Sequence, residues 1–112
     1  MPTRIQTVSS IVVVEDPLVT RLVHSVLGRR GYDVSEASPH VALELLSRPD
    51  SPVSLIVTNT PGIFLRFADR VRLLYMAASP DYNLAGRFQS CRVLHKPFHP
   101  AELVSAVASL LS

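Results

Sequence analysis

Polar residues that could do chemistry follow several short apolar runs of this 112-residue chain. Glu15 and Asp16 follow the first run, and Asn59 follows a central one. Lys96 follows the last run. In an open α/β sheet, binding sites form beyond the carboxyl ends of the parallel strands. If these runs are strands, two acids, an amide and an ammonium group therefore converge on one rim of a sheet.

The apolar runs alternate with helical patterns, which is typical of βαβ units. Five runs are predicted to be strands: Ser10–Val14, Tyr32–Glu36, Val53–Thr58, Arg72–Ala77 and Arg92–His95. Helices are predicted to begin at Pro17, Pro39 and Pro100, because proline is favoured in the first helical turn. Asp16 and Ser38 can cap the first two helices. The pattern predicts an α/β fold with a mostly parallel sheet covered on both faces.

Apolar periodicity indicates which helical residues face the core. Gly31 is expected to close the first helix. Three sets of inward-facing residues are predicted: Leu18, Val19, Leu22, Val23, Val26 and Leu27; Val41, Ala42, Leu45 and Leu46; and Leu103, Val104, Val107, Leu110 and Leu111.

The middle of the chain is short of helix. About a dozen residues separate the third and fourth predicted strands, which is close to the minimum for a parallel crossover. They allow at most two helical turns, around residues 63–70. Residues 79–90 contain proline, asparagine and glycine, which disfavour a long helix. A shortened helix would leave apolar sheet surface bare, and we expect a second copy of the chain to help cover it. Residues that could cover part of this surface are Phe64, Leu65, Phe67 and Val71.

Composition bounds the class of protein. A hydrophobic content of 47% supports a packed core, and no apolar run is long enough to cross a membrane. The net charge of +2 is too small to indicate a nucleic-acid partner. The single cysteine, Cys91, permits no internal disulfide, so we expect a packed thiol and a cytoplasmic location. We expect a flexible leader over residues 1–9 and one domain over residues 10–112.

Four stretches carry a resemblance to a known family. They are "VVVEDPLVTRLVHSVLGRRGYDVSEAS", "LIVTNTPG", "LYMAAS" and "LHKPFHPAEL", in this order along the chain. With them, residues 10–112 resemble the receiver domains of two-component signalling. The resemblance implies a flavodoxin-like, receiver-like fold, which is a doubly wound five-stranded parallel sheet with strand order 2-1-3-4-5. In this chain the third helix would be shortened and the fourth helix weak.

The resemblance also implies a lost reaction. Receiver domains accept a phosphoryl group from a histidine kinase on an aspartate, with Mg²⁺ held by acidic residues. Asn59 stands at the acceptor position, and a neutral amide is not a nucleophile. Ala77 stands where the family has a hydroxyl that binds the phosphoryl oxygens. Val93 stands at the aromatic switch position. The sequence is therefore similar to a degenerate receiver, or pseudo-receiver.

The resemblance implies that part of the family's phosphate-binding site is retained in this sequence. Lys96 is retained at the position of the family's phosphate-binding lysine. Anchoring the comparison on Pro17 matches Val14 and Glu15 to the family's acids, whereas a one-residue gap matches Glu15 and Asp16. In either register an acid is expected near Lys96, and the pair could hold two loops together. Weak Mg²⁺ binding at Glu15 and Asp16 stays open, although Asn59 disfavours it.

We expect a phosphorylation-independent signalling and protein-interaction module, because nucleophile, hydroxyl and switch aromatic are lost together. Its binding surface is expected near the fourth and fifth strands and the last helix. The partner is expected to be a histidine kinase, another response regulator or a second copy. Two alternatives stay open: a receiver phosphorylated at Glu15 or Asp16, and an anion- or nucleotide-binding domain that uses the vacated pocket near Lys96. No nucleophile–base pair or Gly-rich phosphate loop is present, so we expect no enzymatic turnover and no cofactor beyond doubtful Mg²⁺.

Overall fold

Five short strands form one parallel sheet, with strand order β2-β1-β3-β4-β5. The computed structural model describes residues 10–112, and the expected leader at residues 1–9 lies outside the described residues. The strands are β1 (Ser10–Val14), β2 (Asp33–Glu36), β3 (Val53–Thr58), β4 (Arg72–Ala77) and β5 (Ser90–His95). The predicted flavodoxin-like fold is confirmed. Only the starts of β2 and β5 differ from the prediction: β2 starts one residue later, and β5 two residues earlier.

Helices connect the strands. They are α1 (Pro17–Gly28), α2 (Pro39–Ser47), the 3₁₀ helix η1 (Pro61–Phe67), α3 (Tyr82–Ala85) and α4 (Pro100–Leu111). Both α1 and α2 begin where proline and a capping side chain coincide. At α1 the Asp16 carboxylate accepts a hydrogen bond from the Val19 amide at 3.0 Å. At α2 the Ser38 hydroxyl accepts one from the Val41 amide at 3.2 Å. Each side chain satisfies an amide that the first helical turn leaves without a partner.

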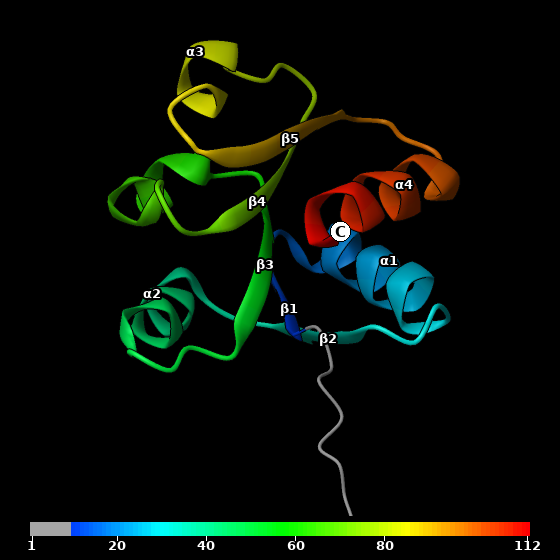
Figure 1. Ribbon diagram of the computed structural model, residues 1–112. Coiled ribbons are helices and arrows are strands. Elements are labelled where there is room, and N and C mark those ends of the chain that lie inside the picture. Colours follow the sequence, from blue (N-terminus) through cyan, green and yellow to red (C-terminus); the bar gives the residue numbers. More distant parts are fainter. Residues whose placement is uncertain (1–9) are drawn as a thin grey trace, which may run out of the picture.

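Helices cover the sheet on both faces (Figure 1). Because successive strand residues point to opposite faces, β1 divides its side chains between two cores. Ile11 and Val13 belong to the core beneath α1 and α4. Val12 and Val14 belong to the core beneath α2, η1 and α3. Burial on both faces explains why the three central strands β1, β3 and β4 are nearly continuous apolar runs.

The short middle elements cover their face of the sheet without a second copy of the chain. As predicted, the third helix is reduced to η1 and the fourth to the four residues of α3. Phe64, Phe67 and Val71 are nevertheless buried against the sheet. Among residues 10–112, Ile63 is the only large apolar side chain of η1 that stays exposed. The predicted bare surface is therefore absent from this face, and with it the reason for expecting a dimer there.

The inward face of the helices is narrower than the apolar pattern predicted. Leu18 is 76% exposed, and Leu22 and Val41 are also exposed, so these predictions are wrong. In α1 the buried positions are Thr20, Val23 and Leu27. Thr20 can be buried because its hydroxyl donates to the Glu15 carbonyl at 3.2 Å. A satisfied polar residue thus takes an inward position, and the two leucines lie on the flank of the helix.

Candidate functional site at the carboxyl edge of the sheet

The ends of four neighbouring strands meet at one rim, as expected for a parallel sheet. The register pairs the terminal residues across the sheet: Val14 with Thr58, and Ala77 with His95. Glu15 follows β1, Asn59 follows β3 and Lys96 follows β5. The Lys96 amide donates to the Ala77 carbonyl at 2.9 Å, which extends the pairing of β4 and β5 by one residue. The lysine is thereby positioned at the rim by backbone hydrogen bonding.

Glu15 and Lys96 form an ion pair across this rim. The Lys96 ammonium lies 2.8 Å from the Oε2 atom of Glu15. The Glu15 side chain has no exposed surface, whereas the Lys96 side chain is 24% exposed. The Glu15 Oε1 atom accepts a hydrogen bond from the Asp16 amide at 3.0 Å. Within residues 10–112 no hydrogen bond of good geometry reaches Oε2, so Lys96 supplies the compensation for burying this oxygen.

Asp16 has a different environment from Glu15. It is exposed, and its Oδ1 atom caps α1. The acid beside Lys96 is therefore Glu15, the residue that both sequence registers had in common. Asp16 takes the structural role that its position before Pro17 predicted.

The donor set at the rim does not fit a Mg²⁺ ion. The ion usually keeps several waters and binds through one or two accessible carboxylates in octahedral geometry. Here Glu15 is buried and neutralised by Lys96, Asp16 is engaged at the helix terminus, and Asn59 carries no charge. Within residues 10–112 no group of three or more histidine, cysteine, aspartate or glutamate residues is arranged to hold a metal ion.

The turn after β3 is organised by threonines rather than by Asn59. The Thr58 hydroxyl is buried, accepts a hydrogen bond from the Thr60 amide at 3.0 Å and lies 3.2 Å from the Thr60 hydroxyl. Asn59 is exposed at the rim. Asn59 therefore presents an amide, and no carboxylate, at the end of β3.

Two aromatic contacts link α3 to the strands beside the rim, and sequence reasoning missed both. The Tyr75 hydroxyl accepts a hydrogen bond from the Asp81 amide at 3.1 Å. The Tyr82 hydroxyl bonds to Nε2 of His95, and the two rings lie 5.9 Å apart. Tyr82 and His95 come from different elements, so no local spacing could have indicated their contact. Val93, which the sequence resemblance matched to a switch aromatic, is half-buried in β5.

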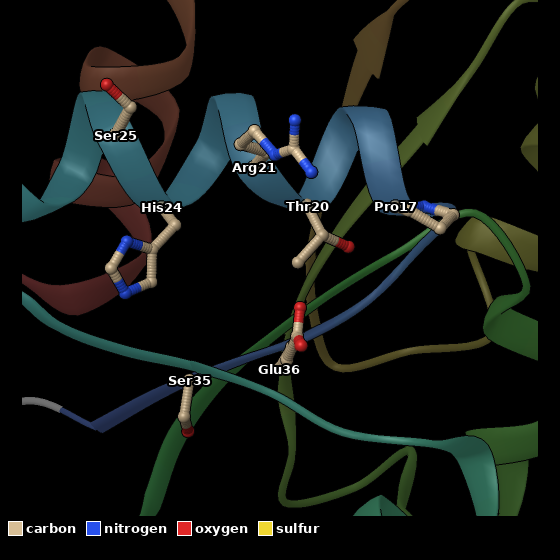
Figure 2. A pocket seen from close by; sticks show the side chains of 7 residues that line it. All are labelled: Pro17, Thr20, Arg21, His24, Ser25, Ser35 and Glu36. Atoms are coloured by element: carbon tan, nitrogen blue, oxygen red, sulfur yellow. The ribbon is translucent and has the colours of Figure 1, made fainter.

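A groove of about 750 Å³ lies beside the rim, between α1 and β2 (Figure 2). Thr20 and His24 extend from α1 toward β2, and Glu36 extends from β2 toward α1 (Figure 2). A neighbouring cavity of about 400 Å³ shares Thr20 and Glu36 and reaches Glu15. Arg21 and Glu36 both line the groove, so its charged groups are of both signs.

Cys91 is a packed thiol. It lies half-buried against the core beneath α2, η1 and α3. Burial raises the pKa of the Cys91 thiol to about 11, because the thiolate is less well solvated there. The thiolate is the nucleophilic form, so the group is less reactive at neutral pH than an exposed cysteine.

Comparison with known proteins identifies the fold. No family model and no curated protein sequence matches the chain. Among solved structures, the chain is similar to the chemotaxis response regulator CheY4 of Vibrio cholerae, with a TM-score of 0.77, 16% identity and coverage of 93% of this chain and 99% of that one. It is also similar to the signal receiver domain of an HD domain-containing protein from Pseudomonas fluorescens Pf-5, with a TM-score of 0.74, 19% identity and coverage of 98% and 91%.

A third similar structure is a response regulator receiver protein from Sinorhizobium medicae WSM419, with a TM-score of 0.72, 20% identity and coverage of 93% and 94%. The chain has the receiver fold. At these identities the likeness establishes the architecture, whereas the chemistry of this rim depends on its own residues.

No helix in residues 10–112 is long and apolar enough to cross a membrane.

Proposed function

We propose that this chain is a pseudo-receiver: a phosphorylation-independent signalling and protein-interaction module on the receiver fold. The observation that carries the proposal is the Glu15–Lys96 ion pair, at 2.8 Å, beside an acceptor position held by Asn59. The lysine that would bind a phosphoryl group is neutralised by a buried carboxylate. Ala77 offers no hydroxyl to such a group. The rim thus joins the β1 and β5 ends without a phosphate.

The two alternatives are less well supported by the same geometry. Phosphorylation at Glu15 would require its carboxylate to leave a fully buried position and to break the ion pair with Lys96. Asp16 is accessible, but its Oδ1 atom is engaged with the Val19 amide. An anion held by Lys96 would have to compete with Glu15 at short range. Recognition of a protein partner requires no rearrangement of Glu15, Asp16 or Lys96.

A surface for such a partner lies on β5 and α4. A groove of about 360 Å³ between the two elements is lined by Arg92, Val93, Ala101, Glu102, Ser105 and Ala106. The Arg92 guanidinium donates to the Ser109 hydroxyl at 3.0 Å and so ties the strand to the helix. β5 is also an edge strand of the sheet. We propose a cytoplasmic protein partner on this surface: a histidine kinase, another response regulator or a second copy.

The chemical part of the proposal is tested by phosphodonor labelling. The wild-type chain and Asn59→Asp are incubated with acetyl phosphate and Mg²⁺, beside a receiver domain that carries an acceptor aspartate. We expect no stable label on the wild-type chain. We also expect its NMR spectrum to stay unchanged when Mg²⁺ is added to several millimolar. Label mapped by mass spectrometry to Asp16 or Glu15 would overturn the proposal in favour of a working receiver.

The recognition part is tested by partner capture. The experiment compares the wild-type chain with Asn59→Asp and Ser105→Arg. Ser47→Arg is the control, because it makes the same chemical change on α2, away from the groove between β5 and α4. We expect wild type, Asn59→Asp and the control to capture the same proteins, and Ser105→Arg to lose them. Light scattering measures self-association with the same variants. Loss of partners in Asn59→Asp alone would show that the acceptor position matters.

A further inference from the structure

A small pocket lies at the opposite edge of the sheet from the rim. Its volume is about 170 Å³, and Val53 and Val71 line it where β3 and β4 begin. Its full lining is Leu46, Arg48, Pro49, Ser51, Val53, Phe67, Arg70 and Val71. Since the rim lies at the carboxyl ends of the same strands, the pocket is separate from the candidate functional site.

The charged groups of this pocket have one sign. Arg48 and Arg70 line it, and no carboxylate does. The three other cavities described in residues 10–112 each include a glutamate: Glu36, Glu15 with Glu36, or Glu102. Within the described part of the chain, neither arginine forms an ion pair with a carboxylate. The guanidinium groups therefore remain available to an anion.

Apolar side chains form another part of the pocket wall. Leu46, Phe67 and Val71 are buried members of the core and line the pocket as well. The Arg70 guanidinium carbon lies 5.1 Å from the centre of the Phe67 ring. Stacking on an aromatic face limits the freedom of a guanidinium group, so less entropy is lost when the group binds a ligand.

The pocket lies beside the turns that follow η1 and α2. η1 ends at Phe67, and the Arg70 amide then donates to the Phe67 carbonyl at 3.0 Å as the chain turns toward β4. On the other side α2 ends at Ser47, and the Ser51 amide donates to the Arg48 carbonyl at 3.2 Å. Two turns bordering the same edge of the sheet thus each contribute an arginine.

We propose that this pocket binds a small organic anion. The planar guanidinium groups of Arg48 and Arg70 suit the oxygens of a carboxylate or a phosphate monoester. The apolar wall favours a ligand with a short hydrocarbon or aromatic body over inorganic phosphate. Drug-sized ligands occupy pockets of roughly 300 Å³ or more, so a pocket of about 170 Å³ suits a smaller molecule. Because the pocket lies away from the rim, this inference does not depend on the proposed function.

The test is a titration of the full chain followed by ¹⁵N–¹H NMR. Benzoate and phenyl phosphate represent the two kinds of anion, benzamide is the neutral counterpart and inorganic phosphate lacks the apolar body. We expect saturable shifts at Ser51, Val53 and Arg70 with at least one organic anion. A Kd on the order of 1 mM is expected for a ligand of this size.

Matched variants assign the binding to the pocket. Arg48→Gln and Arg70→Gln should each weaken binding about tenfold, the loss expected for one charge-assisted hydrogen bond. Arg87→Gln makes the same charge change at an exposed residue outside the pocket and should leave the Kd unchanged. Equal binding of benzamide, shifts confined to other residues, or an equal effect of Arg87→Gln would overturn the proposal.

Discussion

The Lys96 ammonium lies 2.8 Å from a carboxylate oxygen of Glu15, and the two side chains differ in exposure. The carboxylate is fully buried, whereas about a quarter of the lysine side chain reaches solvent. Each partner would thus be left in a different environment if the other were removed. Because a buried charge without a counter-ion is costly, the effects of two single substitutions should be unequal.

Lys96→Met should destabilise the fold more than Glu15→Gln. The methionine variant leaves a buried carboxylate without compensation, at a cost of about 3–5 kcal/mol in the free energy of unfolding. In the glutamine variant Lys96 can turn its ammonium group toward water, and the cost should be about 1–2 kcal/mol. Urea denaturation of both variants at neutral pH measures the difference. Equal costs would contradict the prediction, which rests on the unequal burial of the two side chains.

Asp16→Ala should lower the free energy of unfolding by about 1 kcal/mol, because the Val19 amide loses its capping acceptor. Asp16→Asn keeps an oxygen at the same position and should be close to wild type. Urea denaturation compares the two variants. A large loss in Asp16→Asn would mean that the negative charge itself matters, contrary to a capping role.

The same substitution at two positions of α1 should separate its buried and exposed leucines. Leu27 is fully buried, so Leu27→Ala should cost about 2–5 kcal/mol. Leu18 is 76% exposed, so Leu18→Ala should change stability by no more than about 0.5 kcal/mol. Thermal and urea unfolding test both. A comparable loss at Leu18 would show that this residue is covered in solution, for example by a second copy.

The stability of the fold should depend on pH through Cys91. Burial raises the pKa of the Cys91 thiol to about 11 in the folded chain, while an unfolded cysteine has a pKa of about 8.5. The folded state therefore holds the proton more tightly. The contribution of the protonated Cys91 thiol to the free energy of unfolding is complete below the pKa of the unfolded chain. It is lost as pH rises through the pKa of the folded chain. Urea denaturation between these pH values should show a decline that Cys91→Ala lacks; a decline unchanged in Cys91→Ala would assign it to other groups.

Much of the fold could be predicted from the sequence because its signals are local. The short apolar runs specify β1, β3 and β4 at the residues where they occur, and the prolines specify the starts of α1, α2 and α4. The alternation of strands and helices then leaves few topologies for a parallel sheet. The shortness of η1 and α3 could also be predicted, since too few residues or too many helix breakers occupy those stretches.

The chemical identity of the rim was determined by the sequence alone: an amide at Asn59, a methyl group at Ala77 and an ammonium at Lys96. Tertiary structure decided which acid pairs with Lys96, because Glu15 turns inward while Asp16 caps a helix. It also decided that Leu18 is exposed, that Tyr82 meets His95, and that Arg48 and Arg70 line one pocket. These outcomes depend on how separate elements pack, and packing brings together residues whose separation in sequence carries no periodic signal.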